Sequence, residues 1–185
     1  MTILGVDPGT LTTGYGIIEL TKGTLSVLSC DAVKNESTDP MPVRLKKIFE
    51  TLSLVMDQFN PDMLAIETAF YGKNAQSALK LGQARGVILL AAVKKNIPTH
   101  EYSPREIKKA LVGHGNASKQ QVQYMIQSQL QLKKLPKGFD TTDALAVAIC
   151  HLQRSLQPAK RYVSWEAFLS SHPEKIRHHP KAKQA

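Results

Sequence analysis

The chain of 185 residues is long enough for one domain with a substantial buried core, and its hydrophobic content of 42% is ordinary for a soluble globular protein. Its longest apolar run, over residues 86–93, is far shorter than the roughly 20 residues that a membrane-spanning helix needs, and we recognise no secretory signal. The net charge of +9 favours a polyanionic partner such as a nucleic acid.

Three strands are predicted near the N-terminus, at residues 2–7, 14–20 and 24–33. Lys22 and Gly23 form the turn between the second and third strands. Helical spacing of apolar residues follows over 43–59, and Asn60-Pro61 ends that helix.

The rest of the chain alternates between strands and helices. The expected elements are a strand over 63–66 that ends at Glu67, a helix over 74–95, a strand over 98–102, and helices over 104–113, 119–130 and 140–154. Ser103 and Glu106 form a capping box at one helix start. This order predicts an α/β fold, with a mixed sheet flanked by helices.

The C-terminal region differs in composition from the rest. Residues 151–185 carry seven Lys or Arg against two acids, so they supply much of the positive charge. We expect one domain over 1–156 and a basic, flexible tail over 157–185. Charge alone leaves open whether the tail contacts a partner or only improves solubility. Cys30 and Cys150 are expected to be reduced core thiols, as in a cytoplasmic protein.

Four acidic residues occupy positions suited to a shared site. Asp7 and Glu67 each follow an apolar strand, and ligands of open α/β sheets tend to bind just beyond the carboxyl ends of strands. Asp140 and Asp143 are three residues apart at a helix start, so they share one helix face. A structural role remains open for each acid, as an Asx turn at Asp7 or as complements of the helix dipole at Asp140 and Asp143.

A cluster of carboxylates would need cations to relieve its repulsion. Carboxylate oxygens suit Mg²⁺ or Mn²⁺, and no Cys/His cluster indicates zinc. Two such ions can activate a water molecule and stabilise the leaving oxygen of a phosphodiester.

Other residues near these acids have two open interpretations. The glycines of the run DPGTLTTGYG would bind a phosphate or would belong to a hairpin. Phe70 and Tyr71 would stack on bases or anchor the next helix. Lys108 and Lys119 would bind phosphate or be solvated helix residues. The 74–95 helix has one stripe whose small residues would let a second backbone approach closely. The stripe consists of Ala75, Ala78, Leu79, Gly82, Gly86, Leu89, Leu90 and Val93.

Five collinear blocks resemble the bacterial RuvC crossover junction endodeoxyribonucleases. They read ILGVDPGT at the start, AIE-x-x-F from Ala65, KNAQSALKLGQARG from Lys73, VGHGNASKQQVQ from Val112 and DTTDALAVAICH from Asp140. The resemblance spans residues 1 to about 156 and implies a ribonuclease-H-like fold with a five-stranded mixed sheet. It also implies a homodimer that resolves Holliday junctions in DNA recombination and repair.

The resemblance assigns roles residue by residue. Asp7, Glu67, Asp140 and Asp143 match a four-carboxylate catalytic site that binds Mg²⁺. Some relatives have His at the position of Asp140. The resemblance further implies that Phe70 stacks at the junction, that Lys108 and Lys119 lie near DNA, and that the enzyme works with the RuvA–RuvB branch-migration complex.

The expected reaction is Mg²⁺-dependent hydrolysis, with two ions per subunit and Mn²⁺ as a substitute. Paired symmetric nicks would leave 5′-phosphate and 3′-hydroxyl ends. The rival functions are an actin-like or sugar-kinase ATPase, for which the chain is too short, and a junction-binding module without catalysis.

Overall fold

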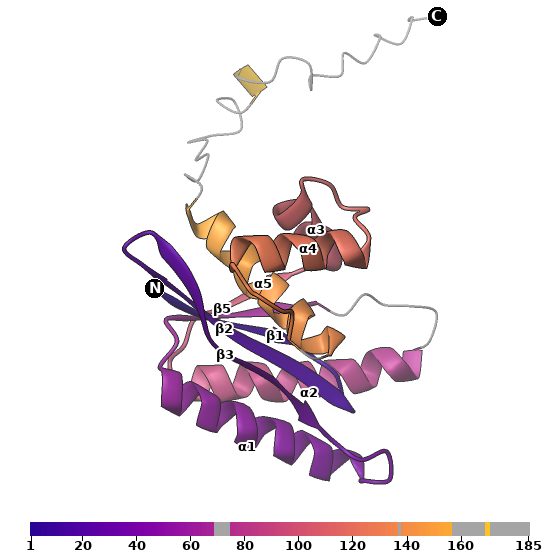
Figure 1. Cartoon of the computed structure of the whole chain (residues 1–185). Coiled ribbons are helices and arrows are strands. Elements are labelled where there is room, and N and C mark those ends of the chain that lie inside the picture. The colour runs from indigo at the N-terminus through magenta and orange to yellow at the C-terminus, as the bar shows by residue number, and fades with distance from the viewer. Residues whose placement is uncertain (69–74, 137, 157–168, 171–185) are drawn as a thin grey trace, which may run out of the picture.

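The computed structural model describes residues 1–68, 75–136, 138–156 and 169–170 and contains a five-stranded sheet with helices on both faces (Figure 1). The elements in chain order are β1 (Thr2–Asp7), β2 (Thr12–Thr21), β3 (Thr24–Lys34), α1 (Met41–Phe59), β4 (Met63–Glu67), α2 (Ala75–Lys94), β5 (Thr99–Tyr102), α3 (Pro104–Val112), α4 (Lys119–Gln129) and α5 (Phe139–Leu156). Within these described ranges, no helix has the length and apolar character needed to cross a lipid bilayer.

The sheet is mixed, and its strand order is β3-β2-β1-β4-β5. The first three strands form an antiparallel meander, while β4 and β5 run parallel to β1. The predicted mixed sheet of five strands is therefore confirmed. The expected turn at Lys22 and Gly23 is also present, and both residues have positive φ angles, of 51° and 82°.

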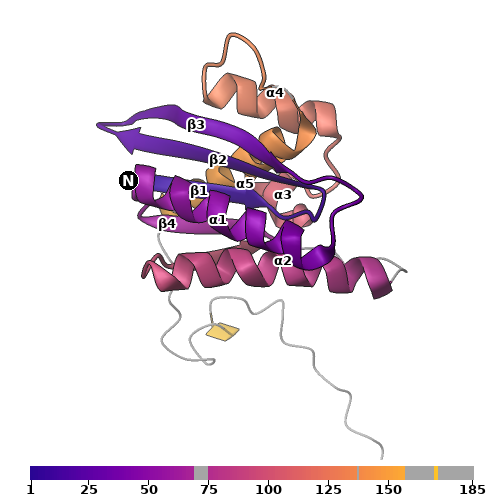
Figure 2. The same cartoon turned by 90° about the horizontal axis from the view of Figure 1, so that it is seen from below.

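Helices α1 and α2 cover one face of the sheet, and α5 lies across the other face with α3 and α4 beyond it (Figures 1 and 2). Each face has its own core because strand side chains alternate in direction. Leu4, Val6 and Ile66 pack with α1 and α2, whereas Ile3 and Ala65 pack with α5.

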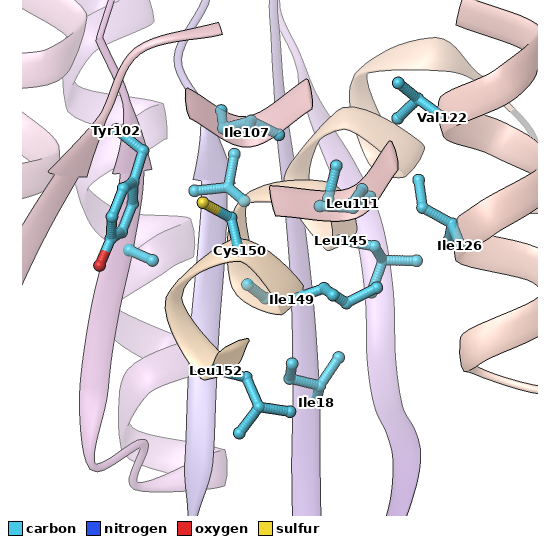
Figure 3. Close-up of a cluster of buried hydrophobic side chains, with 14 of the residues drawn as sticks. Ile18, Tyr102, Ile107, Leu111, Val122, Ile126, Leu145, Ile149, Cys150 and Leu152 are labelled. Carbon is cyan, nitrogen blue, oxygen red and sulfur yellow. The ribbon is translucent and has the colours of Figure 1, made fainter. Parts of the chain in front are cut away.

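Helix α5 is the central helix of the fold. Every residue from 141 to 152 is buried except Asp143, because the sheet covers one side of the helix and α3 and α4 cover another (Figure 3). Cys150 is among these buried residues, and both Cys150 and the half-buried Cys30 are free thiols. Asp143 is thus the one partly exposed residue in an otherwise buried run.

The two glycines in β2 and one in β1 let α5 approach the sheet closely. A Cβ added to Gly14 would lie 2.0 Å from the carbonyl oxygen of Asp140, and one added to Gly5 would lie 2.1 Å from that of Ala144. A Cβ on Gly16 would meet the Leu145 side chain at 2.6 Å. Gly14 and Gly16 are therefore explained by helix packing, which neither the phosphate nor the hairpin interpretation anticipated.

Helix α2 presents most of the predicted stripe to solvent. The core-facing residues are instead Ala84, Ile88, Ala91 and Ala92. Six residues of the stripe are exposed, namely Ala75, Leu79, Gly82, Gly86, Leu90 and Val93. The other two members, Ala78 and Leu89, are half-buried, and Leu89 packs against the core.

Candidate active site

Strand register brings Asp7 and Glu67 together. Strands β1 and β4 are parallel neighbours whose last paired residues are Val6 and Ile66, so the two acids follow at the same level of the sheet. Asp7 lies two residues after Gly5, which faces α5, and Glu67 lies two residues after Ala65, which packs in the same core. Both side chains therefore leave the sheet on its α5 side.

The first turn of α5 brings the other two acids to this edge. Asp143 lines a pocket of about 300 Å³ together with Asp7 and Glu67. Asp140 is partly buried one turn earlier, and its carbonyl group lies against Gly14. It is not among the pocket's lining residues, but its charge is close enough to raise the pKa of both Asp7 and Asp143.

The buried carboxyl groups are hard to ionise. Burial, followed by the charge of Glu67, raises the pKa of Asp7 to about 8. Burial and the charge of Asp143 raise the pKa of Glu67 to about 7. Burial also raises the pKa of Asp143. The pocket therefore lacks the positive charge that would hold all its carboxylates ionised at neutral pH.

Two lysines supply part of that positive charge. Lys108 of α3 and Lys119, the first residue of α4, both line the pocket. The Lys119 Nζ lies 3.7 Å from an Asp143 carboxylate oxygen. Lys108 and Lys119 both lower the pKa values of Glu67 and Asp143, although burial outweighs them.

Capping boxes fix the helices that carry these lysines. Ser103 and Glu106 exchange side-chain and backbone hydrogen bonds at the start of α3, as predicted. Ser118 and Gln121 do the same at the start of α4, immediately before Lys119. This second capping box was not identified in the sequence analysis, although the Ser-x-x-Gln pattern would have indicated it.

The carboxylates share a pocket without forming a ready-made ligand set. Across the described ranges, no group of three or more His, Cys, Asp or Glu side chains is arranged to hold a metal ion. The pocket is lined by the carboxylate oxygens of Asp7, Glu67 and Asp143, and such oxygens suit a hard divalent cation. Their negative charges are not fully balanced by nearby positive charge. The chemistry of these carboxylates therefore fits such an ion.

Some predicted site residues lie outside the described residues. Phe70 and Tyr71 fall within 69–74, and the basic tail over 157–185 is described only at 169–170. The stacking role of Phe70 and the flexibility of the tail therefore remain predictions.

Comparisons with known proteins identify the family. The family model described as "Crossover junction endodeoxyribonuclease RuvC" matches residues 3–151. The chain belongs to the RuvC family of crossover junction endodeoxyribonucleases. A RuvC of Christiangramia forsetii is 45% identical over 95% of this chain and 92% of its own length, and one of Salinibacter ruber is 41% identical over 95% and 99%.

Solved RuvC structures match the fold as well. The Thermus thermophilus RuvC structure has a TM-score of 0.78 and 33% identity over 84% of this chain and 95% of its own. A second structure, of T. thermophilus RuvC in complex with a Holliday junction substrate, has a TM-score of 0.77 and 29% identity over 84% of this chain and 95% of its own. The ribonuclease-H-like fold and the family membership implied by the sequence resemblance are confirmed.

Proposed function

We propose that this protein resolves Holliday junctions by cutting two strands symmetrically, with Asp7, Glu67, Asp140 and Asp143 as its catalytic carboxylates. The observation that carries the proposal is the acidic pocket at the ends of β1 and β4, in a chain that matches the RuvC family over residues 3–151. The T. thermophilus relative solved with a Holliday junction supports a four-way junction as the substrate.

The cofactor of this site is Mg²⁺, with Mn²⁺ as a substitute and two ions per subunit. Divalent cations bound here would activate a water molecule and stabilise the leaving oxygen of the scissile phosphodiester. The carboxylates hold and orient these ions. Because Asp7 and Glu67 have raised pKa values, binding of a cation would release protons from the pocket.

The two lysines of the pocket bind the phosphate backbone. Lys108 and Lys119 bring positive charge to the rim of an acidic site that must accept a polyanion. Phe70, three residues after Glu67, stacks on bases at the junction. Cleavage would leave 5′-phosphate and 3′-hydroxyl ends that a ligase can seal.

A homodimer would place two such sites on one junction. The exposed stripe of α2, defined by Ala75, Leu79, Gly82, Gly86, Leu90 and Val93, recurs every three or four residues and lies on one side of the helix. A Cβ on Gly82 or Gly86 would meet no described atom within 4 Å, so a second helix can approach closely. An isologous dimer through this stripe gives paired nicks in a near-two-fold junction.

Cleavage of a synthetic four-way junction tests the proposal. We expect the full chain with Mg²⁺ to nick two strands of like polarity at symmetric positions near the branch point, and to leave a linear duplex of the same arm sequence intact. A chain that binds the junction without cutting it would instead be a junction-binding module. Addition of the RuvA–RuvB complex to the same reaction tests whether the chain acts together with that motor.

A further inference from the structure

Lys119 contacts an aromatic ring that the proposed reaction does not use. The ammonium nitrogen lies 4.8 Å from the centroid of the Phe139 ring, in addition to its 3.7 Å contact with Asp143. Phe139 is the first residue of α5 and directly precedes Asp140. The lysine therefore lies between an aromatic face and a carboxylate at the rim of the pocket.

The ion pair alone is a weak restraint on this lysine. The Lys119 side chain is 62% exposed, and exposed ion pairs gain little because water screens them and the long side chain loses conformational freedom. A cation over an aromatic face is attracted by the quadrupole of the ring, and the ring contributes no atom that would compete for the N–H donors. The ammonium keeps its donors for Asp143 and for a phosphate.

The backbone at Phe139 is fixed at the start of α5. The Thr142 hydroxyl donates a hydrogen bond of 2.8 Å to the Phe139 carbonyl oxygen and closes the first turn of α5. Gly138, with a φ of 96°, turns the chain into the helix immediately before it. The Phe139 side chain is nevertheless 58% exposed, so burial in the core does not explain an aromatic residue here.

We propose that Phe139 is a positioning residue that holds the Lys119 ammonium group over the acidic pocket, ready for a DNA phosphate. This inference rests on the proposed function, which gives Lys119 its phosphate-binding role. The Phe139 ring is the added feature, because it restrains the Lys119 side chain. Loss of the ring would leave Lys119 tethered to Asp143 alone, and the lysine would then spend less time in its binding geometry.

The contact can be measured without DNA or activity. In protein with ¹³C-labelled lysine, the Lys119 Hε signal is assigned as the one absent from Lys119→Met. We expect ring-current shielding of this signal in the native protein and in Phe139→Trp, and its loss in Phe139→Leu. A Lys119 signal that does not move in Phe139→Leu would overturn the proposal.

A double-mutant cycle on junction affinity tests whether Phe139 acts through Lys119. Without Mg²⁺, we expect Phe139→Leu to weaken junction binding roughly two- to five-fold, as loss of an exposed cation–π contact predicts, and Phe139→Trp to restore it. In the Lys119→Met background the same change should have no effect. Equal weakening in both backgrounds would mean that Phe139 contacts DNA directly and would refute the positioning role.

A matched control comes from helix α4. Tyr124 is an aromatic residue that is 70% exposed, and Tyr124→Leu should change neither the Lys119 signal nor junction affinity. Failure of the proposed function would be seen separately, as absence of cleavage by the native protein. The lysine signal is independent of that result.

Discussion

At the residue scale, the acids of the pocket combine strong burial with too little positive charge. Asp7 and Glu67 have raised pKa values for this reason, and Lys108 and Lys119 compensate only part of the repulsion. Such an arrangement destabilises a metal-free protein and favours binding of a divalent cation. Two predictions follow from this balance, one for cleavage and one for stability.

Neutralising either strand acid should abolish cleavage. Asp7→Asn or Glu67→Gln removes a proposed metal ligand, and we expect junction cleavage in Mg²⁺ to fall by more than about 100-fold, because loss of even an indirect partner of a ligand can cost that much. Gel-shift assays should show that both variants still bind the junction. Near-normal cleavage by either variant would contradict the catalytic assignment.

The stability of the metal-free protein should fall as pH rises from about 4 to about 8. Asp7 has a pKa of about 8 in the folded protein against an ordinary value of 3.8, so within this window the folded state binds the proton that the unfolded state has released. Raising the pH therefore favours unfolding, and the effect levels off above pH 8.

Urea unfolding at several pH values measures this effect. Asp7→Asn cannot ionise, so its free energy of unfolding should depend less on pH and should exceed that of the native protein at pH 8. Added Mg²⁺ should stabilise the native protein more than the variant. Parallel pH profiles for the two proteins would argue against the raised pKa of Asp7.

At the element scale, the position of α5 depends on close contact with β1 and β2. The glycines at 5, 14 and 16 leave room for the helix, and the helix start then carries Asp140 and Asp143 to the ends of β1 and β4. Packing and catalysis are therefore linked, since a change that moves α5 also moves two of the proposed ligands.

Gly14→Ala should separate α5 from the sheet. The new Cβ would lie 2.0 Å from the Asp140 carbonyl oxygen, which is backbone and cannot rotate away. We expect a loss of about 2–3 kcal/mol in the free energy of unfolding, as for overpacked cores, and weaker Mg²⁺ binding by calorimetry.

Ser26→Ala is the control for this substitution, because Ser26 is exposed on the edge strand β3. It should change stability by less than about 0.5 kcal/mol. A Gly14→Ala protein as stable as this control would show that α5 can shift at little cost.

At the scale of the whole molecule, α2 uses one side for the core and leaves an apolar stripe exposed. Leu79, Leu90 and Val93 are between 53% and 70% exposed in the single chain. The pocket and the stripe lie at different places on the fold, so disrupting the proposed dimer need not damage the individual site.

Leu90→Glu should weaken the dimer by at least about ten-fold, because it places a charge in an apolar interface. Sedimentation at several concentrations would measure the change, and junction cleavage should shift from paired to single nicks as the dimer dissociates. Tyr124→Glu introduces the same charge on α4, on the other side of the sheet, and should leave self-association unchanged. An unchanged dimer in Leu90→Glu would exclude the α2 stripe as the interface.

The order of strands and helices was determined by local sequence patterns. Strand-like apolar runs, helical spacing and capping residues predicted the ten elements of the described residues to within a few positions, since each pattern reflects the local geometry of one element. The acids at 7, 67, 140 and 143 were identifiable because each follows an apolar run or starts a helix, and the family resemblance covered the same positions.

Tertiary structure alone decided which surfaces meet. Periodicity marked one apolar stripe on α2, and only the structure showed that a different side of the helix packs in the core. Likewise, glycines in β2 could be explained only once α5 was placed against them. The raised pKa of Asp7 and the contact of Lys119 with Phe139 both depend on segments far apart in sequence. Local sequence encodes the elements, whereas packing between distant segments sets the electrostatics of the site.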